Sequence, residues 1–406
     1  MTDEERVKIA KQEYKNLKVN QKIEVDGKKV GYVCDVINNK VTGEQSYIIT
    51  DGNPKTQQPG EVQNVTVLYR GSTSPGEILN DPLDVVVDWG VNNAKILKEQ
   101  LPSLGHTPTI QMQSSANTLN SAMNKYSNAQ FEVYGHSQAS TNGQYALSSL
   151  DSTDKINRIK GAYLYQGPNA YPMLSKQQKA TAKSLKDKIF NFVDDKDIVP
   201  IGYWRKTVGN VIYVDSKKVG MTDQHMWGGY QFDNGNLKIK KKSEVSFIIA
   251  QNKQVMANEL EYFKKLSKKL TLSGGGLSSN EKLYLDSEQA RIIVEKALSD
   301  FQIATENLIK IHQDGIREAQ ELWQEALSEA RSKGTLLNEG EIRSSLEIVG
   351  CTESKIVTQP CEKYQGKIDK ITTMAESFSS LTSEIQAKIN EVVQRDSELA
   401  QQLKEI

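Results

Sequence analysis

The chain has 406 residues, of which 37% are hydrophobic and 25% are charged, so it is long enough for two or three domains that each bury a core. The chain has 51 lysine and arginine residues and 51 aspartate and glutamate residues. Its net charge therefore gives no general attraction to nucleic acid or to an anionic membrane surface. No run of 18 apolar residues occurs, and the charged start Met1–Arg6 lacks the apolar core of a secretory signal peptide. We therefore expect neither a membrane protein nor a standard Sec substrate.

The first half of the chain alternates short β-rich runs with helix-prone stretches, from about residue 20 to residue 215. Asp26-Gly27, between the first two runs, predicts a tight hairpin turn. Strands separated by helices are typical of a mostly parallel sheet with helices on both faces, so we expect an α/β domain over residues 1–242. The predicted strands are Lys22–Val25, Val30–Ile37, Tyr47–Thr50, Val65–Tyr69, Phe131–Tyr134, Ile159–Tyr165, Ile189–Val193 and Val211–Val214.

The sequence pattern in the second half of the chain predicts only helices. From Ser243 onward there is no strand pattern, and Pro360 is the sole proline. Apolar or small residues recur at steps of three and four from Ala290 to Ala330 and again from Tyr364 to Leu403. Each stripe is one face of a long helix, and the first helix is on the order of 50 residues long.

These two helices, joined by residues 334–361, predict an antiparallel hairpin that forms an all-α domain over residues 277–406. Residues 243–276 are expected to be a connecting helix followed by a glycine-rich hinge at Leu272–Gly276. Two interpretations stay open for the apolar stripes: a self-contained bundle with a third helix at 245–270, or a surface that binds a partner.

Three cysteines, Cys34, Cys351 and Cys361, are too few for a disulfide scaffold and lack the spacing of zinc ligands. Cys351 and Cys361 are close enough in sequence to pair across a short loop, and the sequence does not decide whether they do.

The pentapeptide Gly135–Ala139 resembles a nucleophile elbow. It follows the predicted strand Phe131–Tyr134 and precedes a helix-prone stretch, and small residues stand two positions before and two positions after Ser137. A serine on such a turn points its Oγ out of the sheet edge, beside the first backbone N–H groups of the following helix. Ser137 is therefore the candidate nucleophile.

An activated serine needs a base, and a carboxylate that fixes the tautomer of that base. In α/β-hydrolases the order along the chain is serine, acid, histidine. Of the four histidines, His225 is the candidate that fits this order. His106 precedes the serine, His136 lies inside the elbow with a side chain that diverges from Oγ, and His312 lies in the C-terminal helices. An ordinary loop histidine is the alternative role for His225.

The predicted strand Ile189–Val193 runs into a cluster of acidic residues. The carboxyl ends of parallel strands lie at one edge of a sheet, so this cluster is expected on the same side as the elbow. Asp194, Asp195 and Asp197 are all candidates for the acid by position, and a solvated surface carboxylate is the alternative for each.

Three motifs in this order resemble the class 3 lipases of the α/β-hydrolase fold, over about residues 60–230. They are the strand and turn Val67–Ser72, the elbow, and Asp197–Pro200, an aspartate followed by an apolar pair and proline. By this resemblance Asp197 is the triad acid, Ser72 and Gln138 donate backbone N–H groups to the oxyanion, and Arg70 is structural.

The whole chain resembles a narrower group, the type VII secreted lipase toxins of Gram-positive bacteria, with the order of domains reversed. In most such toxins an N-terminal helical LXG-type domain precedes the enzyme, whereas here the helical hairpin comes last. The resemblance implies phospholipase A activity on membrane lipids and an immunity protein in the producer. It also implies small helical partners of the WXG100-like or LXG-associated kind on the hairpin, and export from the cytoplasm without a Sec signal.

The sequence thus predicts a secreted serine lipase or phospholipase A that uses Ser137, Asp197 and His225, requires no metal or cofactor and binds no nucleic acid. Two alternatives remain: a general carboxylesterase or triacylglycerol lipase whose C-terminal helices oligomerise, and a non-catalytic secreted interaction protein.

Overall fold

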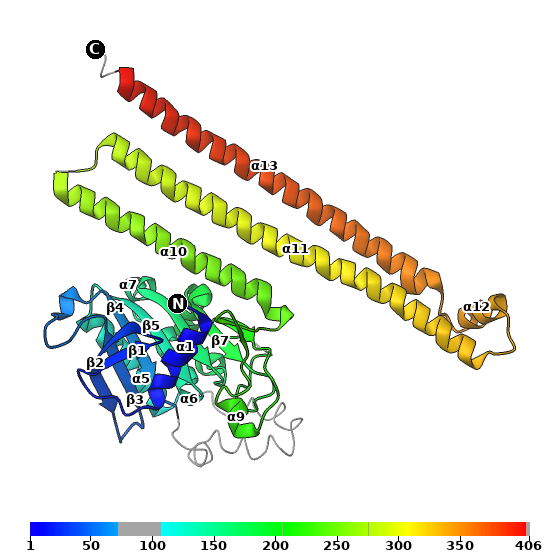
Figure 1. Ribbon diagram of the computed structural model, residues 1–406, viewed down its shortest axis with the longest axis horizontal. Coiled ribbons are helices and arrows are strands. Elements are labelled where there is room, and N and C mark those ends of the chain that lie inside the picture. Colours follow the sequence, from blue (N-terminus) through cyan, green and yellow to red (C-terminus); the bar gives the residue numbers. More distant parts are fainter. Residues whose placement is uncertain (72–106, 205, 275, 403–406) are drawn as a thin grey trace. The chain divides into compact units, whose positions relative to one another are not determined.

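The computed structural model describes residues 1–71, 107–204, 206–274 and 276–402 (Figure 1). The chain divides into two compact units, Met1–Gln254 and Val255–Ile406. The first unit is an α/β unit and the described part of the second is helical, as the sequence predicts. No helix in these ranges is long and apolar enough to cross a membrane.

An eight-stranded sheet forms the centre of the first unit, and its strands lie side by side in chain order. The first three pairings are antiparallel and the last four, from β4 to β8, are parallel. All eight predicted strands are present, with ends that differ by at most two residues. The strands are β1 Lys22–Val25, β2 Lys28–Asn38, β3 Gln45–Thr50, β4 Asn64–Tyr69, β5 Gln130–His136, β6 Ile159–Tyr165, β7 Ile189–Val193 and β8 Asn210–Tyr213. A separate hairpin pairs β9 Phe232–Asp233 with β10 Asn236–Leu237.

The predicted turn between β1 and β2 is confirmed. Asp26 and Gly27 both have positive φ, 50° and 74°, as a two-residue hairpin turn that follows the twist of its strands requires.

Helices cover both faces of the sheet, and each face has its own apolar core. One core combines odd-numbered side chains of β4 and β5, such as Val67 and Phe131, with α5, α6 and α8. The other combines Leu68 and Phe192 with α1 and the first turns of α10. The helices of this unit are α1 Asp3–Ala10, α5 Ile110–Lys125, α6 Gln138–Ser148, α7 Thr153–Asn157, α8 Lys176–Ser184, α9 Met221–His225 and the beginning of α10 Lys241–Gly274, with 3₁₀ turns η1 Lys11–Tyr14, η2 Pro59–Glu61, η3 Tyr171–Met173 and η4 Lys186–Lys188.

The parallel part of the sheet positions the candidate site. Because β4 to β8 run in the same direction, the segments that follow them leave the sheet at one edge. Ser137 directly follows β5, Asp197 lies just beyond β7, and His225 ends α9 after β8. Residues far apart in the chain are thereby brought to a common edge.

The second unit contains the predicted antiparallel hairpin. Its helices are the end of α10, α11 Ser279–Lys333, α12 Glu339–Ile348, a π-helical turn η5 Ser354–Thr358 and α13 Gln359–Gln402. Phe301 of α11 stacks on Phe378 of α13 with ring centroids 4.3 Å apart, and His312 stacks on Tyr364, so the two apolar stripes face each other. The two helices run antiparallel (Figure 1). The thiols of Cys351 and Cys361 are free.

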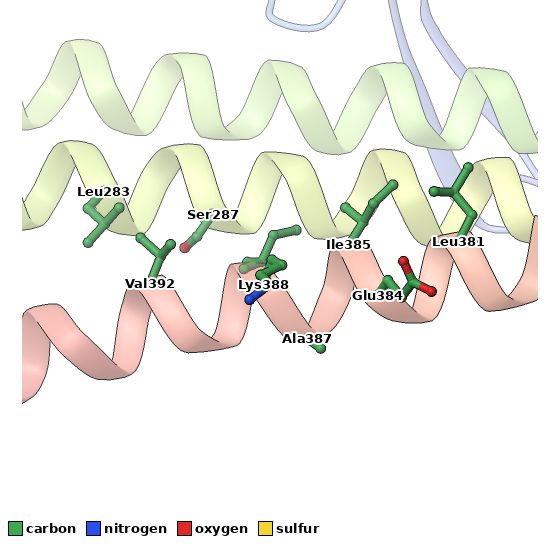
Figure 2. Close-up of a pocket in the computed structure, with 9 residues that line it drawn as sticks. Leu283, Ser287, Leu381, Glu384, Ile385, Ala387, Lys388 and Val392 are labelled. Carbon is green, nitrogen blue, oxygen red and sulfur yellow. The ribbon is translucent and has the colours of Figure 1, made fainter.

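The hairpin leaves much of its apolar surface exposed. Large apolar side chains of both helices are about half exposed, including Ile293, Leu308, Ile311 and Leu322 of α11 and Met374, Leu381, Val392 and Leu399 of α13. A mainly apolar groove of about 750 Å³ lies between the helices, and Figure 2 shows its lining. The lining residues are Leu283 and Ser287 of α11 and Leu381, Glu384, Ile385, Ala387, Lys388, Ile389 and Val392 of α13.

We predict that the core beneath the elbow is a main source of stability. Leu164 on β6 is fully buried, and replacing it by alanine should lower the free energy of unfolding by about 3 kcal/mol, because the cavity that forms is only partly filled by relaxation. Urea denaturation measures this change. Lys160→Ala, on the same strand but with a 40% exposed side chain, should cost less than about 1 kcal/mol; equal losses for both variants would contradict the assignment of the core.

Candidate active site

Ser137 lies at a strained turn between β5 and α6. Its backbone has φ 59° and ψ −130°, a conformation that residues with a side chain rarely adopt, and α6 begins at the next residue. Gly135 permits the turn, because a Cβ at that position would lie 2.6 Å from the carbonyl oxygen of Ala139. The amide of Ser137 donates to the carbonyl oxygen of Tyr165 at 2.9 Å, which ties the turn to the end of β6. This is the geometry of a nucleophile elbow.

The turn after β4 packs directly against the elbow. A Cβ on Gly71 would lie 2.7 Å from the carbonyl oxygen of His136 and 3.5 Å from Cβ of Ser137, so a residue without a side chain is needed there. Gly71 precedes Ser72, one of the two predicted oxyanion donors, which lies outside the described residues. Gln138, the other predicted donor, is the first residue of α6, where backbone N–H groups point out of the helix end.

The side chains of His225 and Asp197 are in direct contact. Nδ1 of His225 lies 2.7 Å from Oδ2 of Asp197, and the two residues are only 6% and 8% exposed. The second carboxylate oxygen, Oδ1, accepts the amide N–H of Val199 at 3.0 Å. Because a carboxylate only accepts, Nδ1 of His225 donates, and Nε2 of the neutral ring carries no proton.

That Nε2 atom is buried and has no hydrogen-bond partner within the described ranges. The carbonyl oxygen of His225 is hydrogen-bonded to Nε2 of His136, the residue directly before Ser137. The centroids of the two histidine rings lie 4.6 Å apart. In the neutral form of the His225 ring, Nε2 carries no proton and can accept one.

The two other candidate acids have different surroundings. Asp194 is fully buried and accepts the side-chain amide of Gln224 at 2.5 Å, so it anchors the residue before His225. Asp195 forms an ion pair with Lys240 at 2.6 Å near the surface. Of the three acids, Asp197 is the one bonded to a histidine, a distinction that sequence position alone does not make.

None of the three other histidines is seen in contact with Asp197 in the described part of the chain. His106 is among the residues that are not described. Both ring nitrogens of His136 are engaged, Nδ1 with the hydroxyl of Tyr14 at 2.6 Å and Nε2 with the carbonyl oxygen of His225 at 2.7 Å. Burial lowers the pKa of His136 well below its ordinary value, so the ring stays neutral. His312 stacks on Tyr364 in the hairpin.

Sequence reasoning missed the N-terminal segment. The 3₁₀ helix η1 brings Glu13 beneath the site, where its carboxyl group is fully buried and accepts the amide N–H of Gly71 at 3.2 Å. A capping box between Thr2 and Glu5 marks the start of α1 and is visible in the sequence. No local pattern, however, indicates that the residues after α1 reach the elbow.

No group of three His, Cys, Asp or Glu side chains in the described ranges is arranged to hold a metal ion.

We predict that Ser137 reacts with a fluorophosphonate probe, since this reagent labels activated serines, and that Ser137→Ala is not labelled. Asp197→Asn should slow labelling by on the order of a hundredfold or more, because an amide no longer holds His225 in the tautomer that accepts a proton. Asp195→Asn, which alters a neighbouring exposed carboxylate, is the matched control and should react at the unmodified rate. Equal rates for the two asparagine variants would exclude Asp197 as the orienting acid.

A family model described as Mbeg1-like, a lipase-like family, matches residues 97–270, a segment that contains Ser137, Asp197 and His225. The match covers less than half of the chain. Among solved structures, the chain is similar to a mutant form of the lipase MDLA from Penicillium cyclopium, at 16% identity and a TM-score of 0.32, over 58% of this chain and 84% of that one. That TM-score is too low to assign a fold or an activity. No curated protein has significant sequence similarity to this chain.

Proposed function

We propose that the α/β unit is a lipase-like serine hydrolase that cleaves carboxylic esters. The observation that carries this proposal is the 2.7 Å hydrogen bond between His225 and Asp197, formed at the sheet edge where Ser137 occupies its strained turn. The match of residues 97–270 to a lipase-like family supports the same class of reaction.

In the proposed reaction, Oγ of Ser137 attacks the ester carbonyl carbon while its proton passes to Nε2 of His225. Asp197 holds Nδ1 as a donor and stabilises the positive ring that forms. The backbone N–H groups of Ser72 and Gln138 donate to the tetrahedral oxyanion. Collapse of the intermediate expels the alcohol, which takes the proton from Nε2, and leaves the acyl group on Ser137. Water activated by His225 then attacks the acyl carbon and releases the acid.

The proposed substrates are acyl esters of membrane glycerolipids, cleaved as by a phospholipase A. The support is the resemblance of Val67–Ser72, the elbow and Asp197–Pro200 to class 3 lipase motifs. The resemblance of the whole chain to type VII secreted lipase toxins extends the proposal to an exported antibacterial toxin, against which the producer carries an immunity protein.

We expect the purified full chain to release fatty acid and lysophospholipid from mixed bacterial lipids. Ser137→Ala should lower the rate by at least about a thousandfold, because it removes the atom that forms the acyl intermediate. Mass spectrometry of the lipid products measures both, and circular dichroism shows whether the variant is folded.

The product pattern separates the alternatives. Hydrolysis of triacylglycerol without phospholipid cleavage would favour the neutral-lipid lipase. Undiminished turnover by Ser137→Ala would contradict the proposed nucleophile, and no hydrolysis of any ester by the unmodified chain would favour a non-catalytic interaction protein.

We propose further that the C-terminal hairpin binds small helical partner proteins during export. The specific observation in favour is the open apolar groove between α11 and α13, flanked by apolar side chains that the hairpin itself does not bury (Figure 2). Ile385 and Val392 of α13 are 39% and 50% exposed, which suits a helix that inserts its own apolar face.

Co-expression of the full chain with small helical proteins of the WXG100-like kind tests this role. Ile385→Glu should abolish co-purification, because it replaces an apolar side chain of the groove by a charge, whereas Ser383→Glu adds the same charge on α13 outside the groove residues and should bind normally. Self-association of the full chain in light scattering, with no binding to those proteins, would instead favour an oligomerisation domain.

A further inference from the structure

Three separate segments meet at His136. The residue belongs to the end of β5 and directly precedes Ser137. Its ring packs against the ring of Trp227, two residues after His225, with centroids 3.8 Å apart. On the other side Tyr14, from the N-terminal turn η1, approaches the ring edge to face at 5.8 Å. His136 therefore contacts the loop of the proposed base and is itself part of the elbow.

The hydrogen bonds of His136 have defined directions. The carbonyl oxygen of His225 only accepts, so Nε2 of His136 donates across the 2.7 Å contact. The neutral ring then has an unprotonated Nδ1, which accepts the hydroxyl proton of Tyr14 across 2.6 Å. The Tyr14 hydroxyl thus donates to the tautomer of His136 whose Nε2 holds the backbone of His225.

The same N-terminal segment supports the turn after β4. A Cβ on Gly71 would lie 2.8 Å from the hydroxyl oxygen of Tyr14, and the amide of Gly71 donates to Glu13. Tyr14 and Glu13 therefore contact the turn, the elbow and, through His136, the His225 loop. Burial raises the pKa of both side chains well above their ordinary values, which favours their neutral forms.

We propose that His136, supported by Tyr14 and Glu13, is a positioning residue that fixes the backbone of His225 relative to Ser137. The inference rests on the proposed serine hydrolase activity and adds residues to it. The N-terminal segment Lys11–Tyr14 thus supports the geometry of the active site, although none of its side chains takes part in the reaction. A displacement of about 1 Å between a nucleophile and its base is enough to cost on the order of a hundredfold in rate.

The test uses the full chain and a soluble nitrophenyl ester, with reactive serines counted by fluorophosphonate at the end point, so that kcat refers to folded protein. His136→Phe keeps a ring against Trp227 but removes the donor to His225, and kcat should fall at least thirtyfold with KM changed less than twofold. His136→Gln places an amide N–H near the position of Nε2 and should recover most of that loss. Tyr14→Phe removes only the hydroxyl and should lower kcat about tenfold.

Tyr126→Phe is the matched control, because it removes another buried tyrosine hydroxyl, 2.8 Å from the sulfur of Cys34 in the opposite core. Its kcat should stay within twofold of the unmodified chain. The proposal is overturned if Tyr14→Phe and His136→Phe also stay within twofold, or if His136→Gln falls as far as His136→Phe. If both His136 variants fail to fold, Tyr14→Phe decides. Ser137→Ala assayed in parallel separates the two claims, since its activity alone tests the proposed hydrolase.

Discussion

The site depends on one constraint, the strained backbone of Ser137 between a buried strand and a buried helix. A serine at φ 59° is unfavourable by itself and persists only because its surroundings determine it. β5 lies between β4 and β6 in the sheet, and the side chains of α6 are almost all buried. Gly135 and Gly71 then let backbone segments approach the turn so closely that a Cβ at either position would collide with a carbonyl oxygen. Packing on both sides of the sheet therefore maintains a geometry that the serine alone would not adopt.

Local patterns predicted most of the fold. Alternating β-rich runs placed all eight strands, Asp26-Gly27 placed a hairpin turn, and two apolar stripes placed the helices that pair Phe301 with Phe378. These features are local because they depend on side-chain periodicity or on the backbone preferences of neighbouring residues. The antiparallel pairing of β2 with β3 and of β3 with β4 was not predicted, since the choice depends on contacts between distant residues.

The candidate site was predictable in part, for the same reason. The elbow is a local motif, and chain order selects His225 among four histidines. Position along the chain does not separate Asp197 from Asp194 and Asp195, whereas their partners do: Asp197 binds His225, Asp194 holds Gln224 and Asp195 pairs with Lys240. The contribution of Glu13 and Tyr14 could not be predicted, because more than 100 residues separate them from His136 and no motif marks the contact. Ser72 lies outside the described residues, so its role as an oxyanion donor stays a prediction.

The two units have different physical characters. The α/β unit buries two apolar cores around a sheet, whereas the helical hairpin exposes apolar side chains along both of its long helices. An enzyme requires the first property, because its catalytic groups must be fixed to within a fraction of an ångström. The second property suits a surface that is completed by another protein. Proposed chemistry and proposed partner binding are thus assigned to separate parts of one chain.

Ser137 is proposed to be the nucleophile of a covalent ester hydrolysis. The most direct measurement is peptide mass spectrometry of the full chain, mixed with a long-chain nitrophenyl ester and quenched in acid during the first turnovers. We expect an added acyl mass on the peptide that contains Ser137, which appears with the initial release of nitrophenol and disappears as substrate is exhausted. Steady ester turnover with no acyl group on that peptide, or with the acyl group on a different residue, would contradict it.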